Sequence, residues 1–168
     1  MAELAISLIV EGVQFDDEFL ESFHNRFDGT VSATDGYIVV TLDVDDAPDR
    51  DQDTTAFVYD KIRRLELATG ARVVRIDLDL VNTTEIAIRL GRTRQQIRKY
   101  ATGENGKGFP RPYGQPSGVR VWDWGSVQSW AVDQGLSDPR DRSLTWLEAI
   151  PVDHRLLASR SQAALTTA

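Results

Sequence analysis

Four side chains able to hydrogen-bond to nucleic acid lie at helical spacing near the middle of the chain: Arg94, Gln95, Arg98 and Lys99. An arginine can donate two hydrogen bonds to one guanine, and a glutamine can pair with adenine. Basic side chains beside them would contact phosphates, which fix the register of a protein on duplex DNA. Because residues three and four positions apart share one face of a helix, the spacing predicts a DNA-contacting surface, with Arg92 just before it.

Two short helices are expected to position this surface. Asn82 can cap a helix, and Glu85 lies three residues later, which is the spacing of a capping box. Gly91 suits a turn with positive φ. Thr93 can cap a second helix, with Gln96 again three residues on, and we expect Thr93 to lie at the DNA surface as well. Two capped helices joined by a tight glycine-containing turn are typical of a helix-turn-helix.

A two-stranded wing is expected after the second helix. Glycines and prolines between residues 103 and 114 prevent the helix from continuing, and residues 119–122 alternate as a strand does. Residues 109–113 facing residues 119–122 would form the wing, with its tip at 114–118. Ser126 then caps a third helix. The DNA contacts expected around the wing are Lys107, Arg111 and Arg120.

Residues 80–131 resemble the DNA-binding domain of the MerR and excisionase (AlpA-like) superfamily. The motifs are Thr-Thr-Glu-Ile-Ala, a Leu-Gly turn, Thr-Arg-Gln-Gln-Ile-Arg-Lys-Tyr, Phe-Pro-Arg-Pro, and Arg-Val-Trp-Asp leading into Ser-Val-Gln-Ser-Trp. The resemblance covers about a third of the chain and implies a winged helix-turn-helix that binds duplex DNA, with its wing on the backbone or minor groove. It places recognition on Arg94, Gln95 and Arg98, and wing contacts on Arg111 and Arg120.

The chain departs from this family in two places. The loop at residues 102–108 is longer and richer in glycine than the family pattern. Residues 1–79 precede the DNA-binding segment, whereas a typical activator or excisionase places that segment first. The resemblance therefore implies DNA contact more directly than it implies a biological role.

Residues 1–79 are expected to form an acidic ferredoxin-like domain. Apolar residues alternate with a period of two at 4–10, 38–44 and 74–80, which is typical of strands with one buried face. Helical spacing at 15–27 and 57–67 predicts two helices, and Asp35-Gly36 predicts the turn of a hairpin. A short strand before that turn completes the order β-α-β-β-α-β, which is ferredoxin-like.

The predicted fold class is α+β with three parts. The ferredoxin-like domain at 1–79 is followed by the winged helix-turn-helix domain at 80–131 and by a helical extension at 132–168. In this extension Pro151 is expected to separate two helices, and residues 161–168 are expected to be frayed.

Charge is distributed unevenly along the 168 residues. The whole chain has a formal net charge of -7, which by itself disfavours nucleic acid as a partner. Residues 1–79 carry 7 basic and 18 acidic side chains, whereas residues 80–130 carry 8 basic and only 3 acidic ones. The average therefore hides a basic module beside an acidic domain, and that domain is expected to weaken non-specific DNA binding by repelling phosphate.

No catalytic residue, cofactor or metal is expected. The chain has no cysteine, and its histidines, His24 and His154, lie at no motif spacing. The acidic segment starting at Asp43 has Pro48 and Thr54 where a calcium loop needs glycine and glutamate. The Gly106-Lys107-Gly108 segment lacks the other residues of a phosphate-binding loop. Enzyme activity is accordingly not predicted.

The predicted function is that of a sequence-specific double-stranded DNA-binding protein, a transcriptional regulator acting as a homodimer. Residues 1–79 would mediate dimerisation or bind an effector or a protein partner. Two alternatives stay open: an excisionase-like DNA-bending factor, and an antitoxin or adaptor whose acidic domain holds a basic partner. Neither a bilayer-spanning apolar stretch nor a basic signal region occurs, so we expect no membrane contact and a cytoplasmic location, at the nucleoid when bound to DNA.

Overall fold

The computed structural model describes residues 2–50 and 52–166, which fall into two compact units. Unit 1 comprises residues 2–77 together with 147–166, and unit 2 comprises residues 78–146. The chain is a mixed α+β protein, as predicted. The boundary after residue 77 lies close to the one expected after residue 79, but the C-terminal part is shared between the two units.

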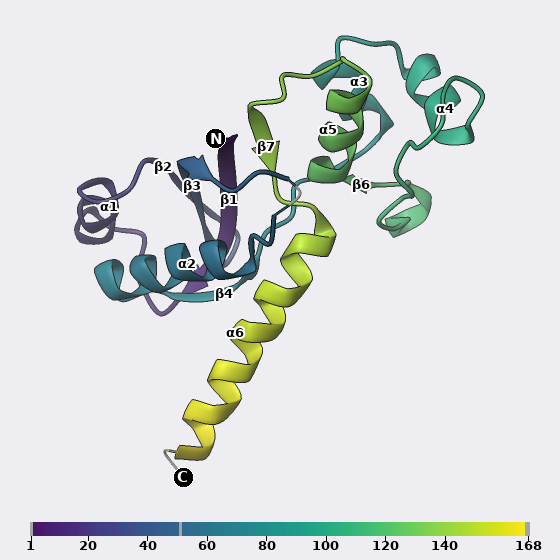
Figure 1. The fold of residues 1–168 in the computed structure, drawn as a ribbon. Helices are drawn as coiled ribbons and strands as arrows, with labels where there is room; N and C mark the ends of the chain where they lie inside the picture. Colours follow the sequence, from purple (N-terminus) through teal and green to yellow (C-terminus); the bar gives the residue numbers. More distant parts are fainter. Residues whose placement is uncertain (1, 51, 167–168) are drawn as a thin grey trace. The chain divides into compact units, whose positions relative to one another are not determined.

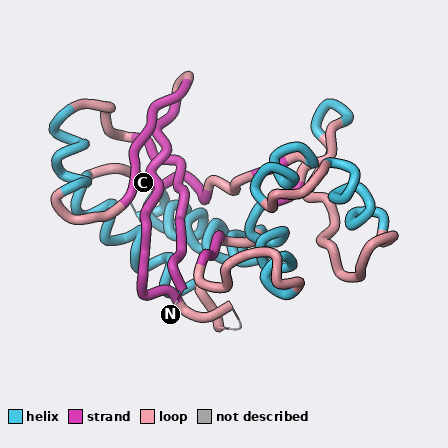
Figure 2. The backbone as a smooth tube through the Cα atoms, turned by 90° about the horizontal axis from the view of Figure 1, so that it is seen from above, coloured by secondary structure: helices cyan, strands magenta, loops and turns pink. Residues whose placement is uncertain are grey.

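An antiparallel sheet lies at the centre of unit 1 (Figure 2). Its strands are β1 (Ala2–Glu11), β2 (Gly29–Thr34), β3 (Tyr37–Ala47) and β4 (Arg72–Ile76). They lie in the order β2-β3-β1-β4, and each neighbouring pair is antiparallel. Along the chain the elements of residues 2–76 follow the order β-α-β-β-α-β.

The apolar alternation of β1 and β3 becomes one buried face of the sheet. Leu4, Ile6 and Leu8 are at most 1% exposed. Opposite residues of the two strands pair as Leu4 with Val44, Ile6 with Leu42, Leu8 with Val40, and Val10 with Ile38. Each fully buried aliphatic side chain contributes about 1.5–3 kcal/mol, so these pairs supply much of the core.

Helices α1 (Asp17–His24) and α2 (Thr55–Thr69) contact each other and complete this core (Figure 1). Asp16 caps α1 by accepting a hydrogen bond from the N–H of Phe19 at 3.0 Å. Leu65 of α2 is fully buried, whereas Leu67, at the end of the apolar pattern predicted over 57–67, is 79% exposed. The reason is geometric, because a step of two residues rotates a helical side chain to the opposite side.

Strand β3 runs through the first part of the acidic segment that starts at Asp43. Asp45 and Asp46 belong to β3, their side chains are exposed, and Ala47 pairs with Ala2 of β1. Pairing with β1 outweighs the weak strand preference of aspartate. In residues 2–50 and 52–166, no group of three or more His, Cys, Asp or Glu side chains could hold a metal ion.

Helix α6 (Trp146–Thr166) corrects the expected C-terminal extension. It runs through Pro151 as one helix, although that proline was expected to separate two helices. Proline removes only the hydrogen bond to the carbonyl of Leu147, near the start of the helix. Buried residues on both sides of Pro151, Ala149 and Val152, hold the helix together across it.

The end of the chain is also more helical than expected. Residues 161–166 belong to α6, and residues 167 and 168 of the expected frayed end lie outside the described residues. The extension predicted at 132–168 is therefore divided. Residues 132–146 belong to unit 2, and residues 147–166 belong to unit 1.

Unit 2 is built from short elements (Figure 1). They are β5 (Leu80–Val81), α3 (Thr83–Arg89), α4 (Arg94–Thr102), a 3-10 helix η1 (Pro116–Gly118), β6 (Trp122–Asp123), α5 (Trp124–Asp133) and β7 (Asp141–Ser143). Their buried side chains form one core of Val81, Ile86, Ala87, Ile97, Trp122 and Val127.

None of the helices in the described part of the chain is long and apolar enough to cross a membrane.

Helix α5 begins earlier than expected. Asp123, rather than Ser126, is its N-cap, and the Asp123 carboxylate accepts hydrogen bonds from the N–H and the hydroxyl of Ser126 at 3.0 and 2.7 Å. Gly125 in the first turn lies against the backbone of Leu144, where an added Cβ would be 2.3 Å from the carbonyl oxygen. A glycine is therefore required at this position for the two segments to pack.

Candidate nucleic-acid interface

Helix α3 starts with the capping box predicted from the sequence. Asn82 Oδ1 accepts hydrogen bonds from the N–H groups of Thr84 (2.9 Å) and Glu85 (3.1 Å), and the Glu85 carboxylate accepts one from the N–H of Asn82 (2.9 Å). These bonds satisfy N–H groups that lack a partner within the helix. Ile86 and Ala87 are buried, so the core of unit 2 fixes the direction in which α3 runs.

A four-residue turn, Leu90 to Thr93, joins α3 to α4. Gly91 has a φ of 60°, a left-handed conformation that costs glycine little and other residues more. The N–H of Arg92 donates to the carbonyl of Ala87 at 2.8 Å, and the N–H of Gly91 donates to that of Ile88 at 3.2 Å. This pair of bonds is a Schellman motif, which ends α3 sharply and fixes the backbone at Arg92.

Helix α4 has a second capping box. The N–H of Thr93 donates to Gln96 Oε1 at 2.8 Å, and the N–H of Gln96 donates to Thr93 Oγ1 at 3.2 Å. The Thr93 hydroxyl also donates to Gln96 Oε1 at 3.2 Å. Thr93 was expected at the DNA surface, and although it is exposed its hydroxyl is used to start the helix.

The polar residues predicted on α4 face away from the core. Ile97 is fully buried, whereas Arg94, Gln95 and Arg98 are exposed and Lys99 is half-buried. Arg94 and Arg98 are four residues apart, so their side chains lie on the same face one turn from each other. The structure therefore brings together the four residues that the spacing placed on one surface.

The wing is smaller than expected. A single bridge joins Gly114 to Val121, where the N–H of Val121 donates to the carbonyl of Gly114 at 3.0 Å. Of the strand predicted over 119–122, only Trp122 belongs to β6, which pairs with β5. Residues 109–113 contribute one backbone hydrogen bond, from the N–H of Tyr113 to the carbonyl of Val121 at 2.8 Å. The expected two-stranded ladder is thus wrong.

Two prolines explain why residues 109–113 do not form the expected ladder with residues 119–122. Pro110 and Pro112 lack the N–H group that a strand donates to its neighbour, so residues 109–113 can form at most part of a ladder. The tip predicted at 114–118 is instead shaped by η1 and by Ser117, which has a φ of 50°. The basic residues of this region, Lys107, Arg111 and Arg120, are all exposed.

Aromatic side chains fix the segment that carries Lys107 and Arg111. The Phe109 ring lies edge-on to Trp122 and Trp130, with centroids 5.9 and 4.8 Å away, and near-parallel to Tyr100 at 6.4 Å. Edge-to-face ring pairs contribute about 0.5–1.5 kcal/mol beyond the burial of area. This cluster joins α4, the segment after it and α5, so it determines where both basic residues leave the core.

The basic residues at this surface have no carboxylate partners. Within the described part of the chain, no ion pair or hydrogen bond is formed by the side chains of Arg92, Arg94, Arg98, Lys99, Lys107, Arg111 and Arg120. In unit 1, by contrast, ion pairs to aspartate or glutamate are formed by Lys61, Arg63, Arg64, Arg72 and Arg75. Cations without a carboxylate partner leave a positive potential around them that attracts phosphate.

In the described part of the chain, the acidic residues of the same segment form no ion pair with these cations. Glu85 and Asp123 accept hydrogen bonds in helix caps, and Glu104 accepts one from the Thr102 hydroxyl at 3.2 Å. Arg89 differs from the other basic residues of the segment because its side chain has partners within the chain. It forms an ion pair with Asp79, and its guanidinium lies 4.8 Å from the centre of the Trp124 ring.

Three exposed apolar side chains of unit 2 were not among the residues predicted from the sequence. Ile88 of α3 is 75% exposed, and Tyr113 and Val119, on either side of the bridge, are each 52% exposed. The motif spacing predicted only polar contacts and gave no signal for these residues.

No function can be assigned to this surface by similarity to a known protein. Comparison of the chain with models of protein families, with curated proteins and with solved structures finds no match.

Proposed function

We propose that this protein binds double-stranded DNA with sequence specificity and acts as a transcriptional regulator, with unit 2 as a winged helix-turn-helix and unit 1 as a ferredoxin-like domain. One observation carries the proposal. On α4, which is capped at both ends, Arg94, Gln95 and Arg98 are exposed and without an intramolecular side-chain partner among the described residues. This is the arrangement by which a recognition helix reaches base edges in the major groove.

The surrounding residues are assigned by their place around α4. Arg92 in the turn and Lys99 further along the helix would contact phosphates on either side of the groove. Lys107, Arg111 and Arg120 would contact the backbone or minor groove beside it. Thr93 and Gln96 fix the start of α4 through the capping box, so their contribution to binding is positional.

A homodimer follows from the size of the proposed interface. A single small module buries too little area for the affinity of a regulator, and two half-sites about 34–36 Å apart would combine their contributions. Unit 1 is the proposed dimerisation domain. Selection from random DNA with the full chain should then recover a palindrome, whose half-site spacing reports the symmetry of the dimer.

The decisive experiment is a salt titration of DNA binding. With about six phosphate contacts per subunit, affinity for a selected site should fall by about 10³ or more between 50 and 200 mM salt. A protein that binds no DNA at low salt, or binds with no salt dependence, would contradict the proposal. Recovery of a bent site in circular-permutation gel shifts would indicate a DNA-bending factor instead of a simple regulator.

Unit 1 supports one rival function, that of a protein adaptor or antitoxin. Outside residues 78–146 the chain carries 19 acidic and 9 basic side chains, a balance suited to holding a basic protein. The two functions differ in one measurable result. An adaptor forms a salt-sensitive complex with its partner while showing no selected DNA sequence, whereas the regulator proposed here selects a sequence without any partner.

A further inference from the structure

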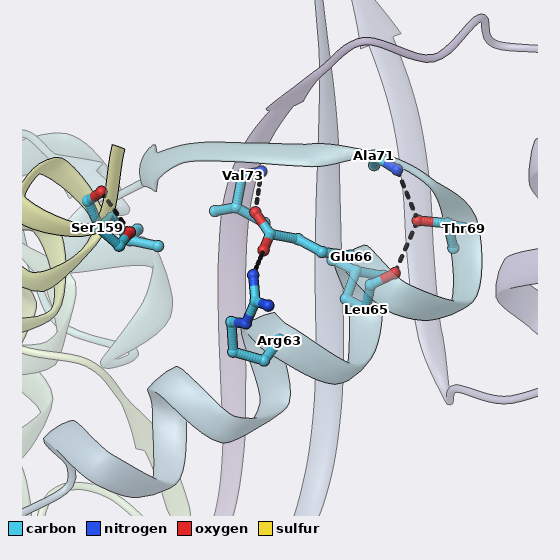
Figure 3. Close-up of polar contacts among 8 residues, drawn as sticks. Arg63, Leu65, Glu66, Thr69, Ala71, Val73 and Ser159 are labelled. Atoms are coloured by element: carbon cyan, nitrogen blue, oxygen red, sulfur yellow. Dashed lines mark hydrogen bonds and ion pairs between the residues drawn. The ribbon is translucent and has the colours of Figure 1, made fainter. Parts of the chain in front are cut away.

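A groove in unit 1 lies between α2, the start of β4 and α6. Its volume is about 540 Å³, and its polar lining residues are Tyr59, Arg63, Glu66, Arg72, Ser159 and Arg160. Figure 3 shows part of its lining, with Arg63 and Glu66 on α2 and Ser159 on α6, together with Val73 of β4, which is hydrogen-bonded to Glu66. Alanine and leucine side chains complete the wall, so the groove has both apolar and cationic surfaces.

The charge of the lining is unusual for unit 1. Three guanidinium groups face one carboxylate in this groove, although the unit as a whole is strongly acidic. Both carboxylate oxygens of Glu66 accept a hydrogen bond, one from Arg63 at 2.8 Å and one from the N–H of Val73 at 3.0 Å (Figure 3). Arg72 pairs with Glu11, which does not line the groove. Among the groups that line the groove, positive charges therefore outnumber negative ones, although the carboxylates of Glu11 and Asp153 act on Arg72 and Arg160 from outside the lining.

Arg160 lacks an acceptor for part of its guanidinium. Its Nη1 atom donates to the carbonyl oxygen of Val74 at 3.2 Å, whereas its Nη2 atom is buried and has no hydrogen-bond partner. Burial, together with the neighbouring charge of Arg72, lowers the pKa of Arg160. A buried donor without an acceptor is costly, and an anion in the groove would remove that cost after a small rotation of the side chain.

We propose that this groove binds a small organic anion, with a carboxylate or phosphate group held by Arg160 and Arg72 and an apolar part against Leu156. Guanidinium groups match both kinds of oxyanion because their N–H groups lie in one plane and can donate in pairs. Tyr59 is fixed at the groove by Arg155, whose guanidinium lies 4.0 Å from the centre of its ring. The site does not depend on DNA binding, and its ligand would be an effector of unit 1.

Two probes that share an aromatic ring distinguish the two anion chemistries. Phenyl phosphate and benzoate are titrated separately into the isotopically labelled full chain, with sodium chloride at matched ionic strength as the control. The expected result is a saturable shift of the amide signals of Tyr59, Glu66, Val73 and Ser159 by at least one probe. A shift with phenyl phosphate alone assigns a phosphoryl ligand, and a shift with benzoate alone assigns a carboxylate.

The same spectra separate this site from the proposed DNA surface, which is also basic. Shifts confined to residues 92–99, or no saturable shift up to about 10 mM probe, would overturn the proposal, because Kd values above this range indicate no specific site. Loss of DNA binding in the salt titration would leave the groove signals unaffected. Failure of one proposal is thus distinguishable from failure of the other.

Substitution of Arg160 tests the assignment of the anion. Arg160→Gln removes the charge and is expected to weaken probe binding about tenfold or more, as expected for loss of a charge-assisted hydrogen bond. Arg64→Gln is the matched control, because Arg64 lies on α2 and pairs with Asp60 but does not line the groove. Its effect should be less than about twofold. An unchanged probe Kd in the Arg160→Gln variant refutes the site. If that variant does not fold, the set of amide signals that the probes shift in the wild-type chain decides the question.

Discussion

The indole nitrogen of Trp122 donates a hydrogen bond of 3.1 Å to the carbonyl oxygen of Pro110. Trp122 starts β6 and is 2% exposed, so this bond ties the segment after α4 to the core of unit 2. Arg111 follows Pro110 directly. The direction in which this basic residue leaves the core is therefore set by a buried tryptophan on another element.

Trp122→Phe is expected to lower the free energy of unfolding of unit 2 by about 1–3 kcal/mol, because it leaves the Pro110 carbonyl without its donor and opens space in the core. Amide hydrogen exchange at Ile97 and Val127 in the core of unit 2 measures the effect. Trp146→Phe is the control, since the Trp146 side chain is 39% exposed and should lose less than about 0.5 kcal/mol. Equal losses in both variants would mean that the indole hydrogen bond has no special role.

The packing of α5 against Leu144 gives a second prediction. Gly125→Ala places a Cβ 2.3 Å from the Leu144 carbonyl oxygen, so one of the two backbones has to move. Overpacking of this kind costs about 1–3 kcal/mol, and exchange at Val127 should speed up accordingly. Gly114→Ala provides the comparison, because its nearest new contact is the Pro116 side chain at 4.0 Å. Similar exchange rates in the two variants would contradict the close approach.

The features predicted correctly from the sequence depend on residues close together in the chain. The two capping boxes, Asn82 with Glu85 and Thr93 with Gln96, each join residues three positions apart, so the motif itself contains both partners. The buried face of β1 follows from alternation within one strand. The hairpin turn at Asp35-Gly36 likewise needs only local geometry, with Thr34 paired to Tyr37.

The features that were missed depend on contacts between distant segments. Nothing near Trp122 indicates that its strand pairs with Val81, about forty residues earlier, instead of with the segment just before it. A helix break was predicted at Pro151 because the residues of unit 1 that bury α6 are far from this proline in the sequence. The groove lined by Arg72 and Arg160 could not be predicted either, because these two residues are far apart in the sequence.

A third prediction concerns the recognition helix. Arg94→Ala combined with Arg98→Ala should weaken binding to the selected DNA site by about 2 kcal/mol or more, roughly 30-fold, since each bidentate base contact contributes about 1–3 kcal/mol. Arg64→Ala removes a basic residue from unit 1, where it already pairs with Asp60, and serves as the control. Fluorescence anisotropy at one fixed salt concentration measures all three proteins. Unchanged affinity in the double variant would show that α4 is not the recognition helix.

The last prediction follows from Asp153 of α6, which accepts a hydrogen bond from the N–H of Ile76 at 2.8 Å. Burial raises the pKa of Asp153, although the Ile76 N–H and the charge of Arg75 act in the opposite direction. Because its pKa is higher in the folded protein than in the unfolded chain, the folded state binds the extra proton. This contribution to stability is present below the unfolded pKa of about 3.9 and is lost as pH rises through the folded pKa.

Asp153→Asn keeps an oxygen for the Ile76 N–H and removes the charge. The Tm of this variant should therefore rise relative to that of the wild type as pH increases from about 3 to 7. Asp138→Asn should show the opposite sign, because hydrogen bonds from the Arg140 side chain and backbone lower the pKa of Asp138. That carboxylate stabilises the folded state above its unfolded pKa, and the stabilisation is lost on acidification. A pair of Tm profiles that both parallel the wild type would show that neither carboxylate couples its proton to folding.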